Sequence, residues 1–279
     1  MLSIAHRLAI VAIAICPLLA SPIAAIPVLA EEGAPLDLTG YTLVFDEEFE
    51  TLDVSPWGPG TRWIAHTPWN GDFGLARFAD PGPDSPFSTK DGILHITAKK
   101  DEHNRWRSGL LSSHDRAGYG FSLKYGYFEI RAKLPPGEGL WSAFWLIGVD
   151  GSEATAEIDI FEHYGDVPHR FTTNVHVFHK TDRAQSHTAR IFNSIPKGLL
   201  YSQFNLIGAL IEEDWIRIYL NRKEIWRTPT PPLHRQERFI LLNLALDPHQ
   251  SIEHTPSPSV MHVDYVKVWA RPHEAPTTR

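Results

Sequence analysis

Hydrophobic and polar residues alternate with a period of two along many short segments of this chain. Between residues 127 and 134, Phe128, Ile130, Ala132 and Leu134 form one apolar face, and the residues between them form a mostly charged face. The same pattern predicts further strands at residues 43–49, 92–99, 172–178, 216–220, 239–246 and 261–269. Helical periodicity is nearly absent. Many short strands in one domain indicate an all-β fold, a two-sheet sandwich or jelly roll.

The first thirty residues differ from the rest of the chain. Arg7 is their only formal charge, and an apolar run from Leu8 to Ala20 is followed by small residues and prolines. This pattern is typical of a secretory signal peptide, here residues 1–30, with cleavage after Ala30. A membrane anchor is the alternative, but the apolar run is shorter than the roughly 20 residues that a span needs. We therefore expect a secreted or periplasmic protein, soluble once the signal is removed, with residues 31–279 as a single domain.

Composition narrows the choice of partners. The chain has 279 residues, 43% of them hydrophobic, and a net charge of -7. This charge has the wrong sign for a protein that neutralises phosphates, so no nucleic acid partner is expected. The single cysteine, Cys16, lies in the predicted signal. Disulfides are therefore not expected to stabilise the mature chain.

The sequence lacks the motifs of several common enzyme classes. The sequence contains no G-x-S-x-G elbow, no G-x-x-x-x-G-K-[ST] phosphate loop and no H-E-x-x-H pair. His176 and His179 are three residues apart, so a regular strand points them to opposite faces. No metal ligand is assigned, and a catalytic transition metal is not expected.

Three acids lie within six residues at positions 157–162, interleaved with Ile158, Ile160 and Phe161. The apolar residues require burial, which predicts a strand on which Glu157 and Asp159 share a face. Glu162 lies at an odd offset and would point into the apolar layer of a regular strand. A β-bulge near residues 160–161 returns it to the face of the other two acids, so we predict that bulge.

Clustered carboxylates suit glycoside hydrolysis, in which one carboxylate attacks the sugar and a second, kept protonated, acts as acid and then base. The retaining form of this reaction needs carboxyl groups about 5 to 5.5 Å apart. Two Glu side chains on one strand, with Asp159 between them, can meet that distance. The alternatives are a calcium site or a surface acidic patch.

The segment 157–162 resembles the E-x-D-x-x-E signature of glycoside hydrolase family 16. It has the bulged form found in laminarinases, agarases and carrageenases rather than the E-x-D-x-E form of lichenases. The similarity extends in order from Tyr41 to Trp269. It includes the opening strand at 43–49, a central strand at 125–135, a G-x-W-P-A-F-W block at 139–145 with Ser142 in place of Pro, and a closing strand at 263–269.

This resemblance implies a jelly-roll sandwich of two curved antiparallel sheets with a substrate cleft on the concave face. It also implies Glu157 as nucleophile, Glu162 as general acid/base and Asp159 as their assistant. The expected reaction is endo-hydrolysis of a β-linked polysaccharide with retention of configuration. No cofactor is required for this chemistry, although Asp264 and Glu48 could contribute to a structural calcium site similar to one in many relatives.

Aromatic residues and amides are expected around the acids, because sugar rings present flat apolar faces. Trp141 and Trp145 share one face of a strand, as do Asn174 and His176 on a strand that resembles the neighbour of the catalytic one. One Trp could instead belong to the core, and His176 could be structural. Segments 69–74 and 106–109 are expected to form loops that rim the cleft, which adds Trp69, Asn70 and Arg107 as candidate substrate-binding residues.

The substrate is less defined than the family. Typical laminarinases carry an N-x-E-L-Q run in the region of residues 74–81, and this chain lacks it. The loop at 69–74 resembles members that act on mixed-linkage glucan or on bacterial exopolysaccharides such as succinoglycan. The sequence thus predicts a monomeric endo-β-glycosidase acting on β-1,3-glucan, β-1,3-1,4-glucan or a succinoglycan-like polymer. A noncatalytic lectin and a transglycosylase are the alternatives.

Overall fold

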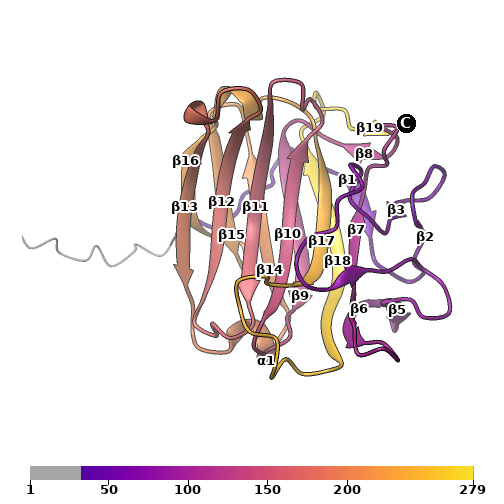
Figure 1. Ribbon diagram of the computed structural model, residues 1–279. Helices are drawn as coiled ribbons and strands as arrows, with labels where there is room; N and C mark the ends of the chain where they lie inside the picture. The colour runs from indigo at the N-terminus through magenta and orange to yellow at the C-terminus, as the bar shows by residue number, and fades with distance from the viewer. Residues whose placement is uncertain (1–32, 279) are drawn as a thin grey trace, which may run out of the picture. The chain divides into compact units, whose positions relative to one another are not determined.

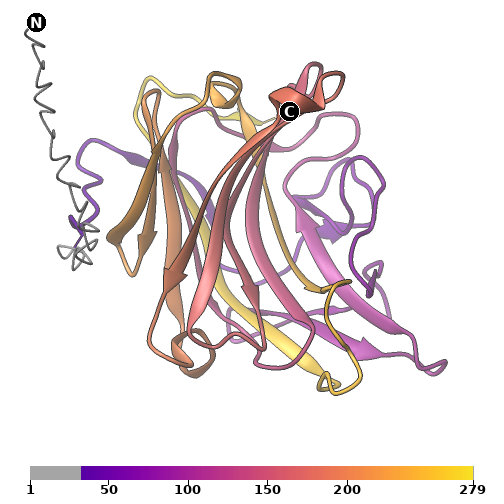
Figure 2. The same cartoon turned by 60° about the vertical axis from the view of Figure 1, so that its left-hand side comes forward.

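Two antiparallel sheets pack face to face in the computed structural model, which describes residues 33–278 (Figure 1). The predicted signal peptide and Cys16 lie outside the described residues. The first sheet, which carries the three acids, consists in spatial order of β13 (His187–Ser194), β12 (Arg170–His179), β11 (Ala154–Tyr164), β10 (Leu140–Gly148), β17 (Arg238–Leu246) and β7 (Trp106–Ser112). Its strands curve along their length (Figure 2).

The second sheet lies behind the first in the view of Figure 1. It consists of β16 (Lys223–Pro229), β15 (Trp215–Leu220), β14 (Asn205–Ile211), β9 (Gly126–Lys133) and β18 (Ser259–Ala270). The two halves of β18 then pair with β1 (Thr42–Glu47) and with β6 (Ile93–Lys100), which also pairs with β5 (Phe87–Lys90). β6 and β7 pair at one end, so the two sheets are joined there.

The remaining elements are short. They are β2 (Val54–Ser55), β3 (Trp63–Ile64), β4 (Arg77–Phe78), β8 (Phe121–Ser122), β19 (Thr277–Thr278), the helix α1 (Leu199–Ser202) and two 3-10 turns at Arg183–Gln185 and Pro232–His234. Within residues 33–278, no helix has the length and apolar character of a membrane span. The predicted all-β sandwich of two curved antiparallel sheets is confirmed.

The inward faces of the two sheets form the main core, and Phe128, Ile130 and Ala132 of β9 point into it as the alternation predicts. Part of the opposite face of β9 is also buried, at Tyr127 and Glu129. There, Tyr127 packs beneath Leu36 and Leu38 of the amino-terminal segment. A polar face in the sequence pattern is thus covered by a distant part of the chain, which local periodicity does not reveal.

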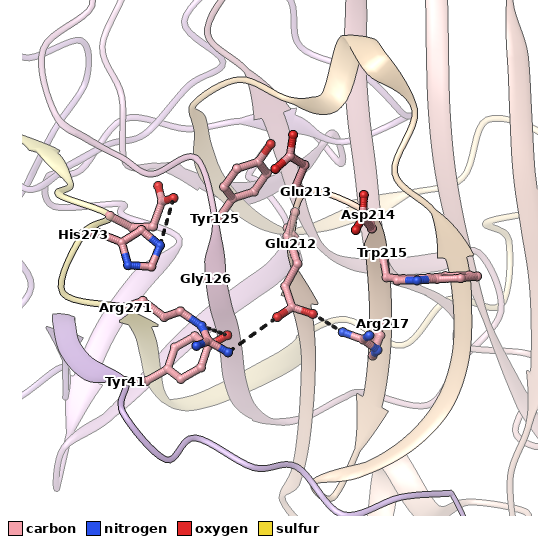
Figure 3. A pocket seen from close by; sticks show the side chains of 12 residues that line it. Tyr41, Tyr125, Gly126, Glu212, Glu213, Asp214, Trp215, Arg217, Arg271 and His273 are labelled. Carbon is pink, nitrogen blue, oxygen red and sulfur yellow. Dashed lines mark hydrogen bonds and ion pairs between the residues drawn. The ribbon is translucent and has the colours of Figure 1, made fainter.

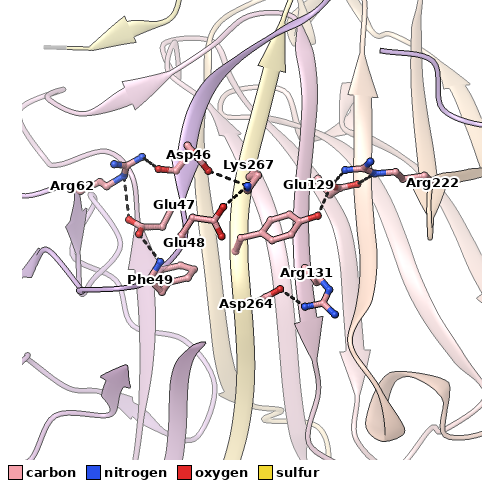
Figure 4. Close-up of polar contacts among 11 residues, drawn as sticks. Asp46, Glu47, Glu48, Phe49, Arg62, Glu129, Arg131, Arg222, Asp264 and Lys267 are labelled. Atoms are coloured by element: carbon pink, nitrogen blue, oxygen red, sulfur yellow. Dashed lines mark hydrogen bonds and ion pairs between the residues drawn. The ribbon is translucent and has the colours of Figure 1, made fainter. Parts of the chain in front are cut away.

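Glu129 of β9 is fully buried on this covered face. Its carboxylate accepts hydrogen bonds from the Tyr127 hydroxyl (2.8 Å) and the Tyr265 hydroxyl (2.9 Å). It also accepts one from Arg222 Nη2 (2.9 Å) (Figure 4). These donors offset the cost of burying a carboxylate. The network ties β9 to β18 and to the turn between β15 and β16.

Residues 106–109, which we expected to be a loop, form the start of strand β7. Trp106 is buried in the main core, and the backbone of β7 pairs with both β17 and β6. Gly109 lies against the Phe87 ring, where an added Cβ would come within 2.5 Å of it. Gly109 is therefore needed for close packing inside the sheet.

Candidate active site

A β-bulge interrupts β11 between Asp159 and Glu162. Asp159 pairs with Asn174 of β12 but Glu162 pairs with Thr172, so three steps on β11 match two on β12. The pairing with β10 shifts at the same place. This confirms the predicted bulge. Ile160 and Phe161 are both fully buried in the core as a result, and Glu162 returns to the outer face of the sheet.

The three acids meet in a cavity of about 230 Å³ on the outer face of the first sheet. Strands β10, β11 and β17 form its floor, and the loop before β4 forms one wall. Its lining residues are Trp69, Phe73, Trp141, Ala143, Trp145, Glu157, Asp159, Glu162 and Asn243. Register explains this gathering, because Ala143 pairs with both Glu162 and Asn243, and Trp145 pairs with Asp159.

Asn174 of β12 connects two of the acids. Its side-chain Nδ2 donates to Asp159 Oδ2 at 3.0 Å and to Glu162 Oε2 at 2.6 Å, while its Oδ1 accepts from Arg190 Nε at 2.6 Å. The amide is fully buried, which fixes its orientation. Asn174 therefore positions Glu162 relative to Asp159 and connects the acid cluster with the positive charge of Arg190.

His176 contacts the same cluster from the next outward position of β12. Its Nε2 lies 3.2 Å from Asp159 Oδ2, and its Nδ1 lies 2.6 Å from Thr188 Oγ1 of β13. These two contacts fix the ring on both sides. Of the three acids, His176 thus contacts Asp159.

Burial and neighbouring charge favour the protonated form of two of the acids. Burial, with the Asp159 and Glu162 carboxylates nearby, raises the pKa of Glu157 well above its usual range. Burial and the Asp159 carboxylate also raise the pKa of Glu162, to about 7, against the opposing effect of hydrogen bonds from Trp141 and Asn174. The cluster therefore holds a proton close to neutral pH.

Aromatic side chains border the acids. Trp141 donates its Nε1–H to Glu162 Oε1 at 3.0 Å, and its ring stacks against Tyr164 with centroids 6.0 Å apart. Trp145 is 6% exposed and donates to Asn243 Oδ1 at 2.9 Å. It lies beneath Trp69, with ring centroids 6.1 Å apart, and Trp69 is 50% exposed. One wall of the cavity is therefore a broad apolar surface beside charged oxygens.

The loop that carries Trp69 is tied to the end of β17. Leu75 N donates to Leu246 O at 2.8 Å, and Gly74 has a φ of +76°. A Cβ at Gly74 would come within 2.4 Å of Leu246 O, so only glycine fits this approach. The loop is thus held over the outer face of the sheet by its backbone.

This geometry agrees with comparisons to known proteins. The family model described as glycosyl hydrolases family 16 matches residues 83–195, the part of the chain that contains the three acids, Trp141 and Asn174. The segment of residues 83–195, which carries the three acids, thus belongs to glycosyl hydrolase family 16.

Two relatives illustrate the range of the family. The chain is 30% identical over 261 residues to endo-1,3-1,4-beta-glycanase EglC of Rhizobium meliloti, an alignment that covers 84% of this chain and 53% of that protein. It is 27% identical over 273 residues to glucan endo-1,3-beta-glucosidase A1 of Niallia circulans, which covers 85% of this chain and 39% of that protein. The chain thus spans about half the length, or less, of these two curated relatives.

Solved structures share the fold of this chain. The catalytic domain of an endo-1,3-beta-glucanase (laminarinase) from Thermotoga petrophila superposes with a TM-score of 0.64 at 24% identity, covering 83% of this chain and 98% of that one. A non-specific endo-beta-1,3(4)-glucanase, SCLam, superposes with a TM-score of 0.68 at 24% identity, covering 86% and 95%.

Two of the predicted cleft residues, Asn70 and Arg107, lie outside the acid cavity. Asn70 is exposed, has a φ of +57° and does not line the acid cavity. Arg107 lies on β7, two strands away from β10, and donates from Nε to Asp101 Oδ2 at 3.1 Å. Arg107 lines a different cavity, because residues 106–109 form a strand rather than a rim loop.

Asp264 and Glu48 each pair with a separate cation on the outer face of the second sheet (Figure 4). Asp264 binds Arg131, whereas Glu48 binds Lys267, which also contacts Asp46 at 3.3 Å. The structural calcium site to which Asp264 and Glu48 could contribute stays a prediction.

A second cavity, of about 340 Å³, lies at the turn between β14 and β15 and contains another group of acids (Figure 3). Its Glu212 carboxylate is paired with Arg217 and lies 3.9 Å from Arg271 Nη2. These cations neutralise the carboxylate. The acid cavity on β11 differs, because no Lys or Arg ion pair to its three carboxylates is present within residues 33–278.

Sequence reasoning missed several residues of the site. Asn243 lines the cavity and accepts from Trp145, but it lies in the middle of an apolar strand, L-L-N-L, where its polar character was the only available signal. Phe73 packs edge-on against Trp141 and Trp145, at 5.4 and 5.9 Å between centroids. Arg190 had no local signal, since only the pairing of β12 with β13 brings it to Asn174.

Proposed function

We propose that this chain is a secreted or periplasmic endo-β-glucanase that hydrolyses β-1,3- or β-1,3-1,4-linked glucan with retention of configuration. The observation that carries the proposal is the meeting of Glu157, Asp159 and Glu162 in one cavity beside Trp69 and Trp145. Support for the substrate class comes from the names of the relatives, an endo-1,3-1,4-beta-glycanase and a glucan endo-1,3-beta-glucosidase. The predicted signal at residues 1–30 supports export.

In this mechanism Glu162 acts first as the general acid. With its pKa raised to about 7, it keeps a proton at mildly acidic pH and gives that proton to the oxygen of the leaving sugar. The Glu157 carboxylate attacks the anomeric carbon and forms a covalent glycosyl ester while the glycosidic C–O bond breaks. Glu162, now ionised, takes a proton from a water molecule as the water oxygen attacks the anomeric carbon. The ester bond between the sugar and Glu157 then breaks, which frees the Glu157 carboxylate.

Glu157 must be ionised when it attacks, although the free site favours its protonated form. Positive charge develops on the sugar ring in the transition state and stabilises a nearby carboxylate. Among residues 33–278 no hydrogen-bond donor contacts the Glu157 carboxylate, so its charge is not already satisfied by the protein. Asp159, held by Asn174 and His176, is the charged neighbour of both glutamates and raises the pKa of each.

The aromatic wall supports a glycan as ligand. Trp69 is half exposed above the buried Trp145, so its ring can stack on a sugar face while Trp145 supports it from below. A lectin needs such a platform but has no need for a coupled set of carboxylates on a bulged strand. A hydrolase function therefore accounts for both the aromatic wall and the three carboxylates of the cavity.

The test uses the purified protein on laminarin, mixed-linkage β-glucan, a succinoglycan-type polymer and an α-linked glucan. We expect oligosaccharide products from one or more of the β-linked polymers, with the β-anomer appearing first by NMR. Glu157→Gln and Glu162→Gln should each lower kcat/KM by about 100-fold or more. Glu153→Gln, at an exposed position one residue before β11, is the matched control and should leave activity unchanged.

Three results would contradict the proposal: activity on the α-linked polymer alone, initial release of the α-anomer, or near-normal activity in either glutamine variant of the cavity. Sequencing the amino terminus of the exported protein tests the signal separately. We expect it to begin at Glu31, and retention of residues 1–30 in the mature protein would contradict export by signal cleavage.

A further inference from the structure

Three potential metal ligands converge at the floor of the acid cavity. One carboxylate oxygen each of Glu157 and Asp159 and one ring nitrogen of His176 all lie within 4.8 Å of one another. Within residues 33–278, this is the only group of three or more histidine, cysteine or acidic side chains that meets this distance. Mixed nitrogen and oxygen ligands are typical of Zn²⁺ and similar transition metals rather than of Mg²⁺ or Ca²⁺.

The backbone holds these ligands on one face of two hydrogen-bonded strands. Glu157 of β11 is directly opposite His176 of β12, and Asp159 is two residues further along β11, opposite Asn174. All three side chains therefore project from the same side of the sheet. Zinc places its ligands about 2.0 to 2.2 Å away, so modest rotamer changes bring the three atoms to bonding distance.

The His176 ring is oriented as in established metal sites. Its Nδ1 lies 2.6 Å from the Thr188 hydroxyl, while its Nε2 faces the carboxylates at 3.2 Å from Asp159 Oδ2. Metal-binding histidines usually donate their second ring N–H to a neighbouring acceptor, which leaves the first nitrogen's lone pair directed at the ion. When a cation binds, a shift of the ring proton to Nδ1, with donation to Thr188 Oγ1, produces that arrangement.

Charge also favours a cation here. The Glu157 side chain is largely buried, and within residues 33–278 no hydrogen-bond donor satisfies its carboxylate. Two carboxylates and a neutral imidazole neutralise one divalent ion. A fourth coordination position is left open toward the cavity, where water can occupy it.

We propose that Glu157, Asp159 and His176 bind a divalent transition-metal cation of the Zn²⁺ class, and that the bound cation blocks the active site. The blocking step rests on the proposed hydrolase function, because it requires Glu157 to be the nucleophile. The metal takes no part in hydrolysis. It occupies the lone pairs that attack the sugar, so the cation and the substrate exclude each other.

Other histidine groups offer incomplete sites and serve as controls. His95 and His262 are cross-strand partners with ring centroids 4.8 Å apart, but Lys133 lies near this pair and opposes a cation. His179, at the end of β12, lies outside the acid cavity. Variants at His262 and His179 therefore separate binding in the cavity from general binding to histidine.

Isothermal titration calorimetry of ZnCl₂ into the chelator-treated protein tests the site without any substrate. We expect one Zn²⁺ site whose dissociation constant rises about tenfold or more in His176→Gln and in Glu157→Gln. His262→Gln and His179→Gln should bind as the unchanged protein does, and MgCl₂ should bind at least tenfold more weakly. Circular dichroism verifies that each variant is folded. Glu157→Gln removes no hydrogen bond within residues 33–278, so it can still test the site if His176→Gln unfolds.

The metal site is overturned by unchanged Zn²⁺ affinity in the His176 and Glu157 variants, by loss of binding in His262→Gln, or by no Zn²⁺ binding at all. A separate measurement tests the block: Zn²⁺ should inhibit hydrolysis competitively with glucan, and EDTA should restore the rate. Inhibition that is noncompetitive contradicts the block alone. Absence of hydrolysis on all of the glucans would contradict the proposed function. Calorimetry would still decide whether the metal site exists.

Discussion

Asn174→Ala should move the pH dependence of hydrolysis toward alkaline pH. Asn174 Nδ2 donates to Glu162 Oε2 at 2.6 Å, and this hydrogen bond stabilises the ionised form of Glu162. Its loss raises the pKa of Glu162 further above its present value of about 7. The general acid then keeps its proton to higher pH, so the alkaline limb of kcat/KM shifts upward.

The expected size of the shift follows from the burial of the pair. A hydrogen bond to a charged group contributes about 1.5 to 3 kcal/mol, and one pKa unit corresponds to about 1.4 kcal/mol. Because Asn174 Nδ2 divides its donation between Glu162 and Asp159, the lower end applies, and we expect a shift of about one unit. The maximal rate should fall as well, since Glu162 loses part of its positioning.

The assay is kcat/KM on the best glucan between about pH 4 and pH 10. Trp141→Phe, which removes the hydrogen bond to Glu162 Oε1 but keeps an aromatic ring, should shift the limb in the same direction. Asn193→Ala is the matched control, because Asn193 Nδ2 donates to Thr173 Oγ1 at 2.9 Å and does not contact the acids. An alkaline limb that stays in place, or moves toward acid, in both site variants refutes this account of Glu162.

Two further predictions concern the cleft wall and the stability of the fold. Trp69→Ala should raise KM for the glucan about two- to tenfold, because a half-exposed stacking surface is lost. Arg107→Ala should leave KM unchanged, because Arg107 is held by Asp101 in a different cavity. Steady-state kinetics of both variants on one polymer compare the two KM values, and a larger effect of Arg107→Ala contradicts the assignment of Trp69 to the cavity wall. Glu157→Gln should raise Tm at pH 8 but not at pH 4: the folded state raises the pKa of Glu157, so it disfavours the ionised form, and that cost grows as pH rises above the ordinary pKa near 4.5. Thermal unfolding at the two pH values checks this, and an equal change at both would show that charge is not the cause.

The local sequence determined the strands and the arrangement of the catalytic segment. Alternation placed Phe128, Ile130 and Ala132 in the core, because a strand's side chains point to opposite faces in turn. The odd offset of Glu162 required a bulge, because a charge cannot remain unpaired among Ile160 and Phe161. These conclusions depend on neighbours within a few residues, so the sequence was sufficient.

Only the tertiary structure decided which distant residues meet the acids and which do not. The pairing of β12 with β13 brings Arg190 to Asn174, and the pairing of β10 with β17 brings Asn243 to the cavity. Arg107 lies outside the acid cavity because it is on β7, which pairs with the side of β17 that faces away from β10. Register between strands far apart in the chain is set by the packing of both sheets at once, which no local pattern encodes. The raised pKa of Glu157 and Glu162 likewise depends on burial that the fold alone creates.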